Sequence, residues 1–319
     1  MRQTSMTPVL DQGGGLWTYR RVADLVVALR DLRLQSHRTR YGEASLPELP
    51  SKTAVASIVD TLTAALFPRH FGPQGLTGDS IDGFVAAALT GALQSLHEQV
   101  QLELDLAAQT AGSDHDDGRR ADHIVSQFGD ELPTIRALLE TDIRAAFEGD
   151  PAAKSLDEVM SCYPGVLAMI RHRLAHSLYR GGAQMLARMV SEAAHASTGI
   201  DIHPGAEIGE SFFIDHGTGV VIGETAIIGR RVRIYQAVTL GAKRFETDQG
   251  GQLLKDYPRH PIIEDDVVIY AGATVLGRIT VGAGSAIAGN VWLTHDVPPG
   301  SMIAQAKERS EVMDGGAGI

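Results

Sequence analysis

The chain has 319 residues, 44% of them hydrophobic and 21% charged, which is typical of an ordinary globular protein with about two domains. Its 28 basic and 39 acidic residues give a net charge of −11, and neither half is basic, so we do not expect nucleic acid as a partner. The single cysteine, Cys162, excludes an intrachain disulfide framework and favours a reducing, cytoplasmic location, and we expect its thiol to be packed. No apolar run is long enough for us to expect a signal peptide or a membrane span.

The first part of the chain has a helical pattern. Residues 1–16 contain three consecutive glycines and are predicted to be a disordered lead-in, followed by a helical domain over 17–198. In that domain apolar residues recur three and four positions apart, and Ser51 is a predicted N-cap. The expected helices include 51–68, 80–109, 131–149, 164–182 and 183–196. The polar segment 111–123 predicts a loop.

A six-residue repeat begins after residue 198. Branched aliphatic residues recur six positions apart, with one step of eight between Ile214 and Ile222 and one interruption between Leu240 and Ile263. The repeated positions are Ile202, Ile208, Ile214, Ile222, Ile228, Ile234, Leu240, Ile263, Ile269, Val275, Val281, Ile287 and Leu293. This spacing predicts one short strand and one corner per unit, stacked into a parallel β-helix.

The β-helix is expected to span residues 199–300, with a tail over 301–319. The interruption in the repeat is polar and rich in glycine, so it predicts a loop extruded from the coil over 241–261. Long loops in compact repeat folds are usually functional.

Few charged or imidazole side chains interrupt the coil pattern, which makes them candidates for chemistry. They are Asp201, His203, Asp215, His216, Arg259, His260 and His295. Asp201 and His216 are fifteen residues apart, a little under one coil, which allows them to lie nearly above one another. An Asp that accepts from one imidazole nitrogen leaves the other nitrogen as a base. The alternative is that these residues only hydrogen-bond the turns, and the spacing by itself favours that alternative.

Several motifs resemble those of the serine O-acetyltransferases of cysteine biosynthesis. They are DIHP (201–204), DHGTG (215–219), RHP (259–261) and the segment that starts with GDP (149–151). The resemblance covers about residues 148–295. It implies an α + β fold, in which an N-terminal all-helical domain precedes a left-handed parallel β-helix of hexapeptide repeats. It also implies a homotrimer, or a dimer of trimers, with sites at the subunit boundaries.

The same resemblance implies an activity, the transfer of acetyl from acetyl-CoA to the hydroxyl of L-serine. No permanently bound cofactor and no metal are expected. His216 would be the general base and Asp201 its orienting partner. The serine hydroxyl must lose its proton as it attacks the thioester, and an imidazole, with an ordinary pKa of ~6.5, suits that task. The residues expected to contact acetyl-CoA are Gly241, Ala242, Ala271 and Gly272.

The substrate itself carries an ammonium and a carboxylate. By resemblance, Asp150 and Asp215 are the carboxylates near the substrate and suit the ammonium. Arg259 offers a planar fork for the carboxylate, and His260 beside it adds a donor.

The family pattern changes after VPPG (297–300), where SMIAQAKERS follows. Lys307 and Arg309 are candidates for the CoA phosphates, although two basic residues on a tail are usually only solvated. The family commonly ends in Ile, which plugs the active site of O-acetylserine sulfhydrylase, so Ile319 is expected to bind that enzyme. A frayed terminus is the alternative.

Three other functions stay open at this point. A metal enzyme resembling the γ-class carbonic anhydrases shares the repeat, but the coil lacks the histidine spacing of such sites. A sugar or antibiotic O-acetyltransferase fits the Asp150 and Arg259-His260 pattern less well than an amino-acid enzyme does. A protein that mainly holds a partner enzyme by its tail is compatible with catalysis. His172 and His176 have metal-ligand spacing on a helix, yet a structural role is expected for both.

Overall fold

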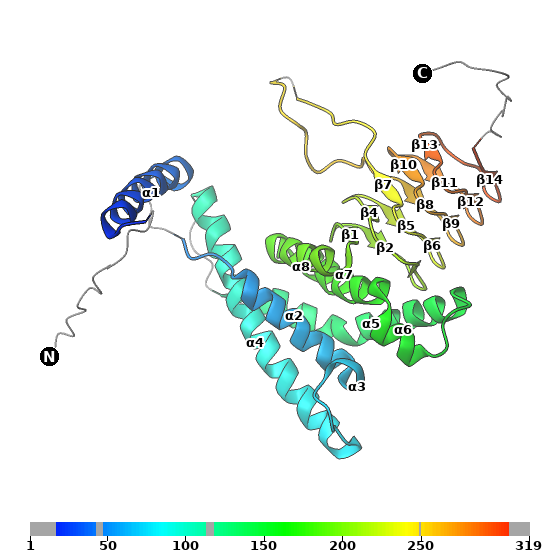
Figure 1. The fold of residues 1–319 in the computed structure, drawn as a ribbon, viewed down its shortest axis with the longest axis horizontal. Coiled ribbons are helices and arrows are strands. Elements are labelled where there is room, and N and C mark those ends of the chain that lie inside the picture. The colour runs from blue at the N-terminus through cyan, green and yellow to red at the C-terminus, as the bar shows by residue number, and fades with distance from the viewer. Residues whose placement is uncertain (1–16, 43–46, 113–117, 249, 306–319) are drawn as a thin grey trace. The chain divides into compact units, whose positions relative to one another are not determined.

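The computed structural model describes residues 17–42, 47–112, 118–248 and 250–305 (Figure 1). Contacts divide the chain into two compact units, one of residues 1–48 with 105–115 and one of residues 49–104 with 116–319. The described part of the first unit holds α1 (Tyr19–Tyr41) and the end of α4. The lead-in predicted for 1–16 lies outside the described residues, as do Lys307, Arg309 and Ile319.

The remaining helices precede the strands in the chain. They are α2 (Lys52–Leu66), α3 (Pro68–Phe71), α4 (Gly78–Ala111), α5 (Arg119–Gly149), α6 (Leu156–Cys162), α7 (Pro164–Gly181) and α8 (Gln184–Thr198). The Ser51 side chain accepts a hydrogen bond from Ala54 N at 3.3 Å, which confirms it as the N-cap of α2. No helix in the described part of the chain is long and apolar enough to cross a membrane.

Two expectations about the helices were wrong. The loop predicted over 111–123 is shorter, because α5 begins at Arg119. Ala121, Ile124 and Phe128 are all buried, so the apolar face of α5 continues through the polar stretch. Cys162, expected to be packed, is an exposed free thiol at the end of α6.

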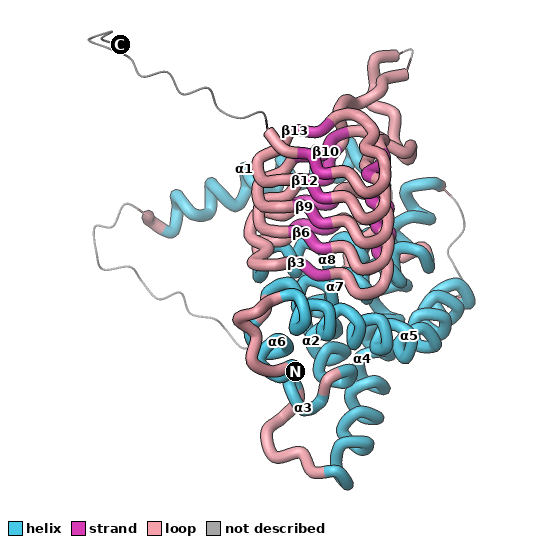
Figure 2. The backbone as a smooth tube through the Cα atoms, turned by 90° about the vertical axis from the view of Figure 1, so that its right-hand side faces the viewer, coloured by secondary structure: helices cyan, strands magenta, loops and turns pink. Residues whose placement is uncertain are grey.

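The second half is a parallel β-helix of short strands. The strands are β1 (Asp201–Ile202), β2 (Glu207–Ile208), β3 (Phe213–Ile214), β4 (Val221–Ile222), β5 (Ile227–Ile228), β6 (Arg233–Ile234), β7 (Thr239–Gly241), β8 (Ile262–Ile263), β9 (Val268–Ile269), β10 (Thr274–Leu276), β11 (Thr280–Val281), β12 (Ala286–Ile287), β13 (Trp292–Leu293) and β14 (Met302–Ile303). They form three sheets, in the orders β1-β4-β7-β10-β13, β11-β8-β5-β2 and β14-β12-β9-β6-β3 (Figure 2). We call these the first, second and third sheets.

Each coil visits the three sheets in turn, so the corners between sheets stack into edges. The third–first edge consists of residues 215–220, 235–238, 270–273 and 288–291. The first–second edge consists of residues 203–206, 223–226, 242–261 and 277–279. Gly241 ends β7, so the extruded loop begins one residue later than expected. These two edges carry the residues of interest.

The aliphatic residues of the repeat point inward and form the core of the coil. Ile222, Ile234 and Leu240 are almost completely buried. The step of eight between Ile214 and Ile222 corresponds to the corner 215–220, which is two residues longer than the corner above it, 235–238. The long corner has three residues with positive φ (His216, Gly217 and Gly219), whereas each of the other corners of this edge has one (Ala237, Gly272 or Asn290).

An ion pair of α5 and α7 holds the first coil. Arg173 bonds Asp142 through Nε at 2.7 Å and Nη2 at 2.9 Å, and both side chains are buried. Arg173 also donates to the carbonyl oxygens of Ile208, at 3.2 Å, and Gly209, at 2.8 Å. Asp142 accepts from Phe212 N at 2.9 Å. Because every oxygen of the pair has donors, the buried charges are satisfied and the chain leading to residue 215 is fixed.

Candidate active site

His216 lies in the long corner of the third–first edge. Its backbone has φ 59°, in the left-handed region that few residues other than glycine and asparagine adopt readily. The imidazole is 69% exposed, while the neighbouring Asp215 carboxylate is only 13% exposed. His216 Nδ1 lies 3.6 Å from Asp215 Oδ1, which is too far for a hydrogen bond. The corner therefore presents an accessible base beside a shielded carboxylate.

Asp150 reaches the same edge from the end of α5. Its carboxylate accepts from Tyr163 Oη and, at 2.8 Å, from Ala152 N. The Tyr163 hydrogen bond is the main reason that the pKa of Asp150 is lowered, and it raises the pKa of Tyr163 to about 12. A weaker electrostatic effect of His216 also lowers the pKa of Asp150. Asp150 is thus an ionised carboxylate that Tyr163 and Ala152 hold in place.

Close packing brings Asp150 to this position. A Cβ on Gly149 would lie 2.6 Å from Arg233 Nη2 and 2.9 Å from Phe213 Cδ1, so only glycine allows α5 to end against the third sheet. A Cβ on Gly165 would lie 2.5 Å from the carbonyl oxygen of Ile214, so α7 also starts directly against this coil. The helices therefore define one wall of the site.

Asp201 is the first residue of β1, in the first sheet beside the same edge. It pairs with Val221, and Gly219 N, in the long corner, donates to the carbonyl oxygen of Gly199 at 2.8 Å. Among the described residues, no hydrogen bond joins Asp201 to His216. The two residues border the same corner without forming the hydrogen-bonded dyad that was expected.

Arg259 and His260 lie on the first–second edge, at the end of the extruded loop and before β8. Arg259 Nη2 donates to Glu224 Oε2 at 2.5 Å, and its guanidinium lies 5.6 Å from the centre of the Tyr257 ring. The His260 imidazole is buried, and burial lowers its pKa to about 4. A Cβ on Gly223 would lie 2.0 Å from His260 Cδ2, so glycine is needed at that position. The predicted substrate residues therefore fall on two different edges.

The residues expected to contact acetyl-CoA divide in the same way. Gly241 and Ala242 lie at the first–second edge, and Ala271 and Gly272 at the third–first edge. Gly272 has φ 72°, and a Cβ there would lie 2.3 Å from Asn290 Oδ1. Each edge thus holds part of both predicted binding sites.

Four residues of these clusters were missed at the level of the sequence. They are Tyr163, Tyr179, Glu224 and Thr225. Glu224 and Thr225 occupy the corner one coil below Arg259 and His260, so stacking the hexapeptide units in rows of three would have brought them together. Nothing in the local pattern indicated the two tyrosines, because both lie on the preceding helical segments.

Three further histidines, His172, His176 and His203, are buried or half-buried. His172 is buried, and burial lowers its pKa well below the ordinary value. His176 Nδ1 lies 2.8 Å from the carbonyl oxygen of Pro204. His203 Nδ1 accepts from Gly205 N at 3.0 Å, so this histidine hydrogen-bonds its own turn, as in the alternative considered for the polar residues of the coil. In the part of the chain that the structure describes, no group of three or more His, Cys, Asp or Glu side chains is arranged to hold a metal ion.

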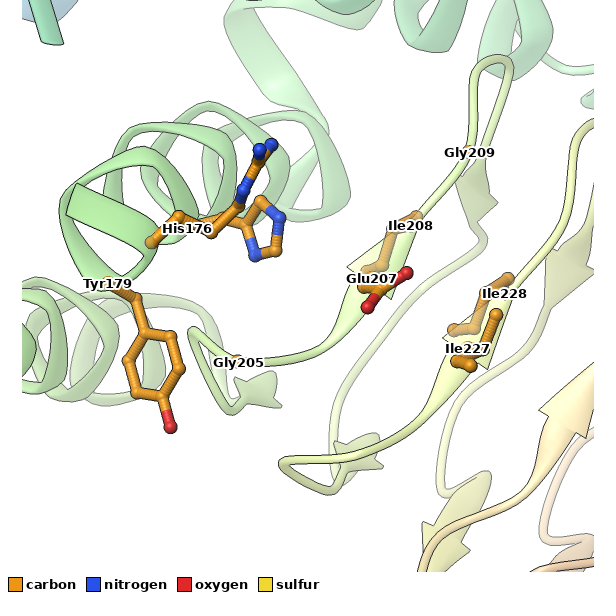
Figure 3. Close-up of a pocket in the computed structure, with 9 residues that line it drawn as sticks. His176, Tyr179, Gly205, Glu207, Ile208, Gly209, Ile227 and Ile228 are labelled. Atoms are coloured by element: carbon orange, nitrogen blue, oxygen red, sulfur yellow. The ribbon is translucent and has the colours of Figure 1, made fainter. Parts of the chain in front are cut away.

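A pocket of about 710 Å³ lies between α7 and the second sheet (Figure 3). Its lining includes His176, Tyr179 and Arg180 of α7 and Glu207 and Ile227 of the sheet. None of the predicted site residues lines it. Tyr179 connects the pocket to the first–second edge, because its hydroxyl donates to Glu224, the partner of Arg259.

Helices followed by short parallel strands stacked in three sheets are the architecture of the left-handed β-helix proteins. No family model matches the sequence. The chain is 54% identical over 275 residues to the plasmid serine acetyltransferase of Synechococcus elongatus, covering 85% of this chain and 86% of that protein. It therefore belongs to the serine acetyltransferase family.

Solved structures agree with this assignment. Serine acetyltransferase isoform 3 of Entamoeba histolytica in complex with cysteine has a TM-score of 0.68 and 33% identity, covering 92% of this chain and 96% of that one. Serine acetyltransferase of Neisseria gonorrhoeae in complex with serine has a TM-score of 0.51 and 27% identity, covering 81% and 97%. The protein is accordingly an acyltransferase that acts on the serine hydroxyl.

Proposed function

We propose that this enzyme uses acetyl-CoA as its acetyl donor and His216 as the base that removes the proton of the L-serine hydroxyl. The observation that carries the proposal is the exposed imidazole beside the shielded Asp215 carboxylate, at the coil against which α5 and α7 pack. As His216 takes the proton, the serine oxygen attacks the thioester carbonyl carbon. The tetrahedral intermediate then expels CoA as a thiolate, which takes the proton from the imidazolium and leaves O-acetylserine. Between the two proton transfers, Asp201 and Asp215 stabilise the imidazolium of His216.

The ammonium of serine is bound by Asp150 and Asp215, which are two carboxylates on one edge. The carboxylate of serine is bound by Arg259, whose planar fork suits two oxygens, with His260 as a second donor. The complexes of the Neisseria gonorrhoeae relative with serine and of the Entamoeba histolytica relative with cysteine support an amino-acid site in this family.

The complete site is assembled between two subunits of a homotrimer. Its two halves are on different edges of one β-helix, with the first sheet between them. In a homotrimer, a rotation of about 120° relates neighbouring copies. If the first sheet of each copy faces the rotation axis, the third–first edge of one copy lies next to the first–second edge of the next copy. Val221 and Trp292 on the outer face of the first sheet are 38% and 70% exposed, which suits burial against other copies.

Acetyl-CoA then lies along the same boundary, between Gly241 and Ala242 of one copy and Ala271 and Gly272 of the next. Main-chain N–H groups near Gly241 stabilise the oxyanion of the intermediate, since backbone approaches a thioester most closely where there is no Cβ. No permanently bound cofactor is required. The exposed thiol of Cys162 suits a cytoplasmic enzyme.

The proposal is tested by thiol release from acetyl-CoA with several hydroxyl acceptors. L-Serine, ethanolamine, L-serine methyl ester and a neutral sugar differ in whether they carry the ammonium and the carboxylate. We expect the highest kcat/KM with L-serine. A higher kcat/KM with the sugar or with ethanolamine would overturn the assignment of the charged residues.

A further inference from the structure

Two dipeptides lie side by side on the first–second edge. Glu224 and Thr225 form the corner after β4, and Arg259 and His260 end the extruded loop one coil above. Thr225 Oγ accepts from Arg259 N at 2.9 Å and from His260 N at 3.1 Å. The loop is therefore anchored to the corner at the two residues proposed to bind the carboxylate of serine.

Glu224 holds the guanidinium itself. Its Oε2 accepts from Arg259 Nη2 at 2.5 Å, and its Oε1 accepts from Tyr179 Oη at 2.9 Å. The Arg259 and Glu224 side chains are 19% and 17% exposed, so the ion pair is shielded from water. Hydrogen bonds from Arg259 and Tyr179 lower the pKa of Glu224 against the effect of burial, so the carboxylate is ionised at neutral pH. Tyr179, on α7, thus connects the helical part of the enzyme to this edge.

Arg259 still has N–H donors for a substrate while Glu224 holds its guanidinium. A guanidinium has five N–H donors, and the described contacts use Nη2 for Glu224 and Nη1 for the carbonyl oxygen of Tyr257, at 3.3 Å. A free arginine side chain loses much rotamer entropy when it binds a ligand. Because the protein has already restricted Arg259, less of that cost falls on substrate binding.

Thr225 determines the tautomer of His260. Thr225 N donates to His260 Nδ1 at 3.0 Å, and Thr225 Oγ lies 2.9 Å from the same nitrogen. A nitrogen that accepts an N–H bond carries no proton, so in the neutral imidazole the proton is on Nε2. His260 can then act as a hydrogen-bond donor only through Nε2.

We propose that Glu224 and Thr225 are positioning residues for recognition of the substrate carboxylate, Glu224 through the guanidinium of Arg259 and Thr225 through the tautomer of His260. The proposal rests on the proposed role of Arg259 in binding the serine carboxylate. It assigns Tyr179 a supporting role, because the tyrosine holds the second oxygen of Glu224.

The test compares a substrate that has the carboxylate with one that lacks it. We would measure kcat/KM for L-serine and for L-serine methyl ester in Glu224→Ala, Glu224→Gln, Thr225→Val and Arg259→Ala. Glu264→Gln is the matched control, because Glu264 accepts from Ala283 N and does not contact Arg259. The quantity compared is the ratio of kcat/KM for L-serine to kcat/KM for the methyl ester. Loss of a charge-assisted contact should lower this ratio about tenfold or more in Arg259→Ala and Glu224→Ala.

The variants separate positioning from a general structural role. Thr225→Val keeps the backbone N–H that donates to His260 Nδ1 and removes only the Oγ that accepts from Arg259 N and His260 N, so it should lower the ratio less than Glu224→Ala does. Glu224→Gln should lower the ratio less than Glu224→Ala, because the amide oxygen still accepts a hydrogen bond. Should Glu224→Ala fail to fold, Tyr179→Phe removes a single hydroxyl and should lower the ratio in the same direction. An unchanged ratio in the Glu224 and Tyr179 variants, with a reduced one in Arg259→Ala, would overturn this proposal alone. An unchanged ratio in Arg259→Ala would overturn the carboxylate role of Arg259 and this proposal with it.

Discussion

Asp215 and Arg259 carry opposite charges and lie on different edges of the same β-helix. Asp215 directly follows β3 on the third–first edge, and Arg259 precedes β8 on the first–second edge. An amino acid needs a negative group for its ammonium and a positive group for its carboxylate within a few ångströms of each other. In one copy of this chain the negative and the positive group lie on separate edges, which is why we place the site between copies.

Replacing His216 by Asn should remove most of the turnover without unfolding the protein. Asparagine tolerates the left-handed conformation that the backbone adopts at φ 59°, so the change removes the base and keeps the corner. Loss of a general base typically lowers kcat by about 10²–10⁴-fold. The measurement is kcat with saturating L-serine, with circular dichroism as the control for folding. A kcat close to that of the wild type would show that another group takes the proton.

Replacing Tyr163 by Phe should weaken the binding of serine and leave that of acetyl-CoA unchanged. The hydroxyl donates to Asp150 and is the main cause of its lowered pKa. Without it, the pKa of Asp150 returns toward the ordinary value of 3.8, so the carboxylate stays ionised at neutral pH and only its orientation is lost. We expect KM for serine to rise about threefold to tenfold, as for loss of one hydrogen bond. Equal increases in both KM values would indicate a structural role for Tyr163.

The hexapeptide repeat allowed the β-helix to be predicted because its signal is local. Each inward aliphatic residue is six positions from the next, and Ile222, Ile234 and Leu240 are buried as that spacing requires. The start of α5 at Arg119 could not be read in the same way, since the exposed face of that helix is as polar as a loop. Exposed helical turns and loops have similar compositions.

Replacing Arg173 by Met should destabilise the protein strongly. Asp142 would remain buried without its partner, and burial already raises the pKa of that carboxyl despite the arginine. Removal of one member of a buried ion pair typically costs about 3–5 kcal/mol. The free energy of unfolding in urea measures the loss, and Arg188→Met, which breaks the exposed pair with Glu192, is the control. Equal effects of the two changes would contradict a structural role for the buried pair.

Acid should destabilise the enzyme through its buried imidazoles. Burial lowers the pKa of His203 and of His260 to about 4, and that of His172 well below its ordinary value. An unfolded chain binds these protons near ~6.5, so protons favour the unfolded state increasingly as the pH falls below that value.

The acid effect is measured by urea unfolding at about pH 7 and about pH 5.5, above the range in which most carboxyl groups titrate. The free energy of unfolding should be lower at the more acidic pH. His172→Met should reduce the difference between the two values, because the variant has one imidazole fewer to protonate on unfolding. A wild-type protein that is equally stable at both values would contradict the prediction.

The candidate site could be predicted only in part. The step of eight in the repeat marked the corner of His216, because an insertion in a regular coil must bulge outward. The pairing of Glu224 with Arg259 joins a residue before the extruded loop to one at the end of that loop, and Tyr163 reaches Asp150 from the start of α7. Such contacts depend on how coils and helices stack, which no short sequence pattern encodes.

The most direct test of the shared site is to mix two inactive subunits. His216→Ala removes the base from the third–first edge, and Arg259→Ala removes the carboxylate ligand from the first–second edge. Mixed trimers are made by co-expression of the two variants in equal amounts, and acetyl transfer is assayed at a serine concentration well below KM. Random mixing pairs two intact edges at about one boundary in four, so we predict recovery of about a quarter of the wild-type rate. Activity no higher than that of the separate variants would contradict a site formed by two subunits.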